Sequence, residues 1–194
     1  MAPRHRKPLL FVGSSVESLK YAYAVQENLD HDALVKVWPQ GVFNIASYGL
    51  DSLLSAARAH DFGVFIFAPD DLVVIRGKRH QAVRDNVLFE LGLFMGRLGR
   101  ERTFVLAPDR GNLHLPSDLL GWNVARFDAK RKDIAAALGV GCNKIRVEIQ
   151  RLGKYRPGMT SKLSATAKII KGSPRRVPPL RNFGRRIVSL VQPI

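Results

Sequence analysis

The sequence of 194 residues contains one cysteine, Cys142, and no apolar run long enough to span a bilayer. A single thiol excludes an internal disulfide and any zinc site built from several thiolates. The apolar run near the N-terminus, PLLFVG, is too short for a secretion signal and is more typical of a strand. We therefore expect a cytoplasmic protein.

The motifs that most often mark nucleotide-binding and hydrolytic sites are also missing. The sequence contains no GxGxxG, no GxxxxGK[ST] and no GxSxG, which argues against the common dinucleotide, P-loop and serine-hydrolase sites. Its five histidines lack the spacing of metal ligands, so we expect no metal site. Helix-turn-helix and zinc-finger patterns are absent as well.

Acidic residues are missing from the C-terminal segment, residues 154–194, which has ten Lys and Arg and no Asp or Glu. The rest of the chain has 21 basic and 16 acidic residues, so most of the net charge of +15 belongs to this segment. Its Pro, Gly and Ser follow no sustained period, which predicts a linker or disordered tail after a domain at 1–153. Such a tail could contact nucleic acid or an anionic membrane, but we favour a solvated, functionless tail, and the stub of a lost partner domain is a further alternative.

Five apolar segments alternate with helical patterns in the first 153 residues, which predicts an α/β fold with a parallel sheet and helices on both faces. With only five strands, the flavodoxin-like order 2-1-3-4-5 is the best prediction. The expected strands lie at residues 8–14, 33–39, 61–69, 101–108 and 123–129.

Helices are expected between the first four of these strands. The first runs from Ser15 to Leu29, and Ser14 with Glu17 resembles a capping box at its start. The second carries its apolar residues at the i, i+3, i+4, i+7 spacing of one buried face. Those residues are Leu50, Leu53, Leu54 and Ala57. The third opens near Arg84, with Asp85 or Asn86 as its N-cap.

The strand order predicts a ligand crevice at the carboxyl ends of the first and third strands, where the winding reverses. Gly13, Ser14 and Ser15 follow the first strand, and Asp70 and Asp71 follow the third. The basic segment from Asp70 to Val83 is long enough to be a lid or a binding loop.

One charged residue stands out within the third helix, RDNVLFELGLFMG. Between Asn86 and Gly96 every residue except Glu90 is apolar or glycine. Burying a lone carboxylate is unfavourable by several kcal/mol unless it is paired or neutralised. Glu90 is therefore either an internal partner of Arg84 or Arg97, or a carboxylate that points into the crevice and stabilises positive charge there.

Five segments occur in an order and at a spacing that match a known family. They are FVGSS, VWPQGVF, DFGVFIFAPDD, RDNVLFELGLFMGRLGRERTFVL and LPSDLLG. Together they resemble the bacterial TIR-like domain family, described as predicted nucleotide-binding proteins. The resemblance covers roughly Pro8 to Gly153, and this part of the chain is similar to the TIR effector domains of STING-type and other cyclic-nucleotide antiphage systems.

This resemblance implies an NAD⁺ hydrolase that cleaves the bond between nicotinamide and ribose, with no cofactor and NAD⁺ as the substrate. The family's catalytic glutamate falls on Glu90. Predicted substrate-binding residues are Gly13, Ser14, Ser15, Trp38, Phe43, Asp70, Asp71 and Asn86. Relatives are activated when a sensor oligomerises their TIR domains, so we expect a homo-oligomer and a sensor domain or protein that responds to a cyclic nucleotide.

Three other functions stay open at this point. One is a nucleoside deoxyribosyltransferase-like enzyme, which also places a glutamate at an N-glycosidic bond. Another is a TIR-like module that binds nucleotides or associates with itself but never cleaves. The third is a nucleic-acid binder that acts through the tail.

Overall fold

The computed structural model describes residues 7–40, 49–109, 113–115, 119 and 124–157. The chain divides into a compact unit, Met1–Arg156, and a second unit, Pro157–Ile194. All the helices and strands described below lie in the first unit. The predicted tail begins at residue 154 and lies almost entirely outside the described residues, so its structure stays a prediction. No helix in the described part of the chain is long and apolar enough to cross a membrane.

A parallel sheet of five strands in the order β2-β1-β3-β6-β8 forms the centre of the fold. Because these are the five expected strands, the predicted order is confirmed. Their bounds are β1 (Leu9–Gly13), β2 (Leu34–Val37), β3 (Phe62–Ile66), β6 (Thr103–Pro108) and β8 (Val124–Phe127).

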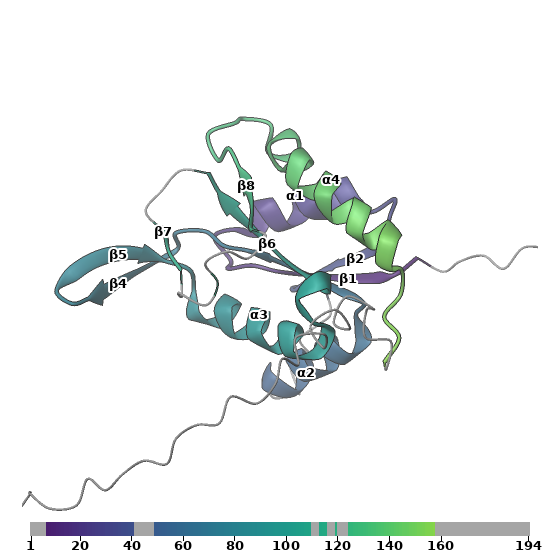
Figure 1. The fold of residues 1–194 in the computed structure, drawn as a ribbon. Helices are drawn as coiled ribbons and strands as arrows, with labels where there is room; N and C mark the ends of the chain where they lie inside the picture. The colour runs from purple at the N-terminus through teal and green to yellow at the C-terminus, as the bar shows by residue number, and fades with distance from the viewer. Residues whose placement is uncertain (1–6, 41–48, 110–112, 116–118, 120–123, 158–194) are drawn as a thin grey trace, which may run out of the picture. The chain divides into compact units, whose positions relative to one another are not determined.

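Helices cover both faces of this sheet, as Figure 1 shows. Helices α1 (Leu19–Leu29) and α4 (Ile134–Leu152) pack side by side on one face. Helices α2 (Gly49–Ala59) and α3 (Asp85–Leu98) pack on the other, and the 3₁₀ turn η1 (Arg100–Arg102) follows α3. The right-handed crossovers of a parallel sheet require this two-sided arrangement.

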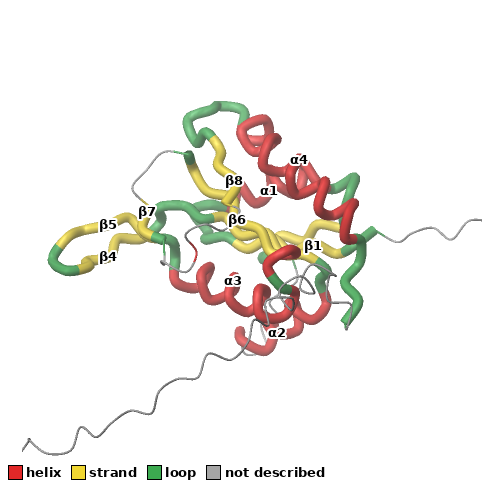
Figure 2. Tube along the Cα trace, in the orientation of Figure 1, coloured by secondary structure: helices red, strands yellow, loops and turns green. Residues whose placement is uncertain are grey.

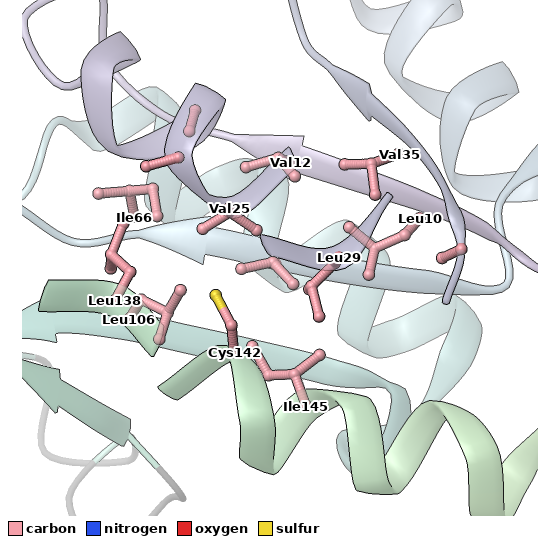
Figure 3. Close-up of a cluster of buried hydrophobic side chains, with 14 of the residues drawn as sticks. Leu10, Val12, Val25, Leu29, Val35, Ile66, Leu106, Leu138, Cys142 and Ile145 are labelled. Carbon is pink, nitrogen blue, oxygen red and sulfur yellow. The ribbon is translucent and has the colours of Figure 1, made fainter. Parts of the chain in front are cut away.

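Two apolar cores result, one on each side of the sheet. Strand β3 contributes to both, because its successive side chains point to opposite faces: Phe62 and Val64 enter the first core and Phe65 enters the second. Figure 3 shows the first core, in which Leu138 and Cys142 of α4 meet side chains of the sheet. A strand buried on both faces explains why the segment at 61–69 is so apolar.

The start of helix α1 differs from the prediction. The helix begins at Leu19 rather than near Ser15, and the Ser14 hydroxyl donates to the Ser15 carbonyl at 3.0 Å instead of capping it. The Ser15 hydroxyl accepts a bond from the Ser18 amide at 3.2 Å, in a turn that precedes the helix. The predicted capping box is therefore wrong, because local turn bonds compete with a cap for the same serine hydroxyls.

Helix α4 was not among the predicted elements. Its sequence does carry the signal, since Asp133 caps it by accepting from the Ala136 amide at 2.9 Å. The buried residues Leu138, Cys142, Ile145 and Ile149 follow at helical spacing. Two glycines and a cysteine within the pattern GVGCN obscured this period.

The segment from Asp70 to Val83 is a β-hairpin rather than an irregular lid (Figure 2). Strand β4 (Asp71–Ile75) pairs antiparallel with β5 (Lys78–Ala82), and the short β7 (Leu113–His114) adds to β5 in parallel. Arg76 and Gly77 form the turn with φ of 50° and 76°. Two successive residues with positive φ are typical of the two-residue type I′ turn that closes tight hairpins.

Gly141 lets α4 approach the sheet closely. A Cβ built on this residue would lie 2.6 Å from Leu106 Cδ2 and 3.3 Å from the Cβ of Ala125. Gly139, two residues earlier, has no such neighbour within 4 Å. Packing against the sheet thus requires Gly141, but it does not require Gly139.

We predict that Gly141→Val lowers the free energy of unfolding by about 1–3 kcal/mol, because overpacking forces side chains and backbone apart. The matched change Gly139→Val should be near neutral, since this helical position is half-buried with nothing within 4 Å of a Cβ, and valine is no worse than glycine within a helix. Urea unfolding followed by circular dichroism measures both values. Equal losses at the two positions would contradict close packing at Gly141.

Candidate functional site

A cavity of about 390 Å³ lies at the carboxyl end of β1, beside the first turns of α3. This is the point between β1 and β3 where the winding of the sheet reverses, which is where ligands bind in open α/β sheets. The cavity is lined by Ser14, Ser15, Val16, Glu17, Trp38, Arg84, Asn86, Val87 and Glu90.

Glu90 is placed by α3 directly over the end of β1. A Cβ on Gly13 would lie 2.7 Å from Glu90 Oε2 and 2.7 Å from Phe65 Cδ1, so the carboxylate and the ring together occupy the space above this glycine. Phe65 in turn packs edge-on against Phe94 of α3, with ring centroids 5.4 Å apart. The glutamate is therefore held in a tight, largely apolar setting.

That setting changes the acidity of Glu90. Burial raises the pKa of its carboxyl group to about 7. Its Oε2 atom is buried and receives no hydrogen bond from any described residue. A buried oxygen without a partner is rare in folded proteins and asks for an explanation, such as a catalytic role or a missing ligand.

The ion-pair interpretation of Glu90 is wrong for both predicted partners. Arg84 contacts Glu17 at 2.9 Å and Asp71 at 3.5 Å. Arg97 lies over the ring of Tyr155, 4.5 Å from its centroid. Neither guanidinium forms a salt bridge with Glu90, so the carboxylate is free to act on a ligand.

Trp38 forms a second wall of the cavity. Its indole Nε1 donates to the Ser14 hydroxyl at 3.3 Å, and its ring packs against both apolar cores. The ring is thus fixed by the fold, and Ser14 is oriented by two hydrogen bonds. An aromatic ring held in this way can stack on a planar ligand.

The two aspartates after β3 do not line the cavity. Asp70 accepts from the Ser15 hydroxyl at 2.5 Å and from the Ser18 hydroxyl at 3.2 Å, so it holds the loop that follows β1. Asp71 contacts Arg84, which does line the cavity. In the structure both aspartates thus reach the site through a neighbouring side chain.

Asn86 lines the cavity four residues before Glu90, on the same face of α3. It does not cap the helix. The N-cap is Arg84, which makes no side-chain cap bond, and the backbone N–H of Asn86 donates to Asp85 Oδ1 at 2.7 Å.

Phe43, the remaining predicted site residue, lies outside the described residues. Sequence reasoning did not assign Val16, Glu17 or Val87 to the site, and their types carried no signal for it.

The described residues contain no group of three or more His, Cys, Asp or Glu placed to hold a metal ion. What the site offers instead is the Glu90 carboxylate in apolar surroundings, an indole, the small residues at the end of β1, and the ion pair between Arg84 and Glu17. Such an arrangement can bind a sugar or a planar cationic ring and can stabilise positive charge that develops next to the carboxylate.

Comparison with known proteins identifies the family. The model of the CAP12/Pycsar effector protein TIR domain matches residues 10–129, more than half of the chain and all of the site described above. The chain belongs to this TIR domain family. The expected bacterial TIR-like family is thereby confirmed.

Several curated proteins are similar to this chain over about three quarters of its length. The Pycsar effector protein PaPycTIR of Pseudomonas aeruginosa is 43% identical over 78% of this chain and 50% of its own length. BcPycTIR of Burkholderia cepacia is 40% identical over 77% of this chain and 50% of its own. A CD-NTase-associated protein 12 from Flavobacterium daejeonense is 38% identical over 76% and 45%. The chain thus spans about half the length of these relatives.

Among solved structures, the flavodiiron core of Flv1 from Synechocystis sp. PCC6803 superposes with a TM-score of 0.45 at 12% identity, over 77% of this chain and 37% of that one. This likeness is too distant to add to the argument. The strand order of the TIR domain itself establishes the fold.

The raised pKa of Glu90 predicts a dependence of stability on pH. In the unfolded chain the carboxyl group ionises near its ordinary pKa of 4.5, but in the TIR domain only near 7. Its contribution to stability is therefore greatest below pH 4.5 and is lost as the pH rises through 7. The loss is a few kcal/mol, since one pKa unit corresponds to about 1.4 kcal/mol.

We expect Glu90→Gln to gain stability relative to the wild type as the pH is raised from 5 to 8, because the amide never ionises. Urea unfolding of both proteins at the two pH values measures this difference. Glu27→Gln, at an exposed position of α1, is the matched control and should show little change. A pH-independent difference between Glu90→Gln and the wild type would contradict a buried, titrating carboxyl group.

Proposed function

We propose that this TIR domain hydrolyses NAD⁺ at the bond between nicotinamide and ribose. The observation that carries the proposal is the Glu90 carboxylate, buried at the floor of the cavity with an oxygen that no described group satisfies. Retaining such a group is unfavourable for folding, so a role with a bound ligand is its best explanation. The cavity volume of about 390 Å³ falls in the usual range for small-molecule sites.

The reaction needs only one carboxylate that is not engaged in an ion pair, and Glu90 is such a group, since the Glu17 carboxylate pairs with Arg84. Nicotinamide leaves NAD⁺ as a neutral molecule, so no general acid has to protonate it, in contrast to most glycosides, whose hydrolysis uses two carboxylates. As the C–N bond breaks, positive charge develops on the ribose, and the ionised Glu90 stabilises it in surroundings that exclude water. Water then adds to the ribose carbon and loses a proton, which gives ADP-ribose.

Other cavity residues bind rather than react in this proposal. Trp38 stacks on nicotinamide or adenine, and Ser14 and Asn86 offer hydrogen bonds to the ribose or its neighbours. Because Gly13 has no side chain, the substrate can approach Glu90 next to the backbone of β1. Ser15 contacts the substrate, and Asp70 orients the Ser15 hydroxyl. Phe43 keeps its predicted place in substrate binding, whereas Asp70 and Asp71 act on the site indirectly, through Ser15 and Arg84.

We further propose that the activity serves antiphage defence and depends on assembly. Relatives of which this chain spans about half are named Pycsar effectors and CD-NTase-associated proteins. A sensor domain or protein that responds to a cyclic nucleotide would bring TIR domains together and so activate them. Contact of the tail with nucleic acid or a membrane is not required for this function.

We predict that concentrated wild-type protein releases nicotinamide from NAD⁺ and that Glu90→Gln lowers the rate by about a hundredfold or more, the usual effect of removing an electrostatic stabiliser. Chromatography of the reaction mixture measures nicotinamide directly. Glu27→Gln, which replaces an exposed glutamate that does not line the cavity, should keep the wild-type rate.

Equal background release by the wild type and Glu90→Gln would contradict hydrolysis by this chain on its own. NAD⁺ binding without release would then favour a non-catalytic nucleotide-binding module. Cleavage of nucleosides in place of NAD⁺ would favour the deoxyribosyltransferase-like enzyme.

The rate should also depend on pH. Because only the ionised carboxylate stabilises positive charge and its pKa is about 7, nicotinamide release should fall about tenfold for each pH unit below 7 and level off above it. Rates measured at saturating NAD⁺ report the pKa of the enzyme–substrate complex, and rates at low NAD⁺ report the pKa of the free enzyme. A flat profile from pH 5 to 8 would show that ionisation of Glu90 does not limit the reaction.

A further inference from the structure

The outer edge of strand β4 has no partner among the described residues. In the three-stranded sheet β4-β5-β7, strand β5 lies in the middle and β4 at one edge. Figure 2 shows β4 and β5 extending together from the body of the domain. A free edge presents a row of backbone N–H and C=O groups that can pair with another strand.

The residues of this edge are unusual for an exposed strand. The sequence of β4 is DLVVI, and Leu72 and Val74 are exposed to 71% and 69%. Strands β2 and β8, at the edges of the main sheet, each carry a cation, Lys36 or Arg126. Lys and Arg side chains normally protect an edge from unwanted pairing, and β4 has neither; its one charged residue, Asp71, is the first of the strand.

The register of the hairpin shows which backbone groups face outward. Ile75 and Lys78 flank the two-residue turn and so exchange both of their hydrogen bonds. Bonded and non-bonded pairs alternate along an antiparallel ladder, so Val73 also bonds towards β5. The N–H and C=O groups of Leu72 and Val74 therefore point to the open edge.

We propose that β4 pairs antiparallel with β4 of a second copy of this chain, about a twofold axis at Val73. In this register Leu72 of each copy lies opposite Val74 of the other. The two outward-facing N–H groups and two outward-facing C=O groups of each strand then form four hydrogen bonds, with none left over on these residues. On one face of the new sheet the exposed Leu72 and Val74 side chains form two apolar pairs, and on the other Val73 meets its own copy.

The charges at the two ends of the strand favour the same arrangement. Each β4 begins at Asp71, directly after Asp70, and is followed by the exposed cations Arg76 of the turn and Lys78 at the start of β5. Antiparallel pairing places the acidic end of one strand beside the basic end of the other, whereas parallel pairing would bring like charges together. The contact is isologous, so it closes a dimer and leaves no free β4 edge to extend it.

This pairing would also touch the proposed active site. The Asp71 carboxylate at the base of β4 contacts Arg84, which lines the cavity. Fixing β4 in an intermolecular sheet would restrain Asp71 and thereby the position of Arg84. Assembly and the geometry of the site are thus linked through one ion pair.

Sedimentation velocity of the full chain over a wide range of concentration tests the surface. We expect the wild type to form a dimer and Leu72→Lys with Val74→Lys to shift it to a monomer. The matched control is Val140→Lys with Val147→Lys, which changes two comparably exposed valines of α4 and should leave the dimer intact. A wild type that stays monomeric throughout, or an equal effect of the two double variants, would overturn the proposal.

Cysteine cross-linking tests the register. The two copies of residue 73 face each other directly at a non-hydrogen-bonded position, where Cβ atoms approach within about 5 Å and a disulfide can form. Val73→Cys should therefore oxidise to a covalent dimer much faster than Leu72→Cys or Val74→Cys, whose copies are offset by two residues. The native Cys142 is buried and stays in place. Equal rates at the three positions would overturn the twofold register, and neither experiment requires NAD⁺ or activity.

Discussion

The site depends on the contact between the Glu90 carboxylate and the backbone of Gly13. Any side chain on Gly13 would occupy the space now filled by Glu90 Oε2 and the ring of Phe65. The contact also requires α3 to lie close to the sheet, which the stacking of Phe94 on Phe11, with ring centroids 4.7 Å apart, secures. The aromatic core beneath the cavity thus determines how far the carboxylate is desolvated, and desolvation alone is what raises its pKa.

The late start of α1 leaves room for this cavity. Ser15 and Ser18 bind the Asp70 carboxylate, so residues 14–18 cross the end of the sheet as a turn instead of continuing the helix. This turn joins the ends of β1 and β3, the two strands between which the winding reverses. The crevice is therefore a consequence of topology, and the serines and Asp70 give it a fixed rim.

The hairpin gives the domain the open edge that we propose as an assembly surface. A type I′ turn at Arg76 and Gly77 makes β4 and β5 a regular ladder, so the outward N–H and C=O groups of β4 alternate regularly along its edge. The same strand begins at Asp71, whose contact with Arg84 reaches the cavity. In a family whose members are effectors, one element that joins the proposed assembly surface to the proposed active site offers a simple physical route for control.

Local pattern was enough to predict the sheet, its order and the crevice, because a strand buried on both faces, such as 61–69, can only be a central strand of a layered α/β fold. The anomaly of Glu90 was likewise visible in the sequence, since no other charged residue interrupts its apolar segment.

Tertiary structure alone decided what surrounds that carboxylate. Arg84 and Arg97 were equally plausible partners by spacing, but the fold turns one towards Glu17 and Asp71 and the other onto Tyr155. The conversion of residues 71–82 into a hairpin, and of Asp70 into a support for Ser15, depended on contacts between distant segments. Periodicity describes one element at a time, whereas a partner, a pKa and a free strand edge are properties of several elements packed together.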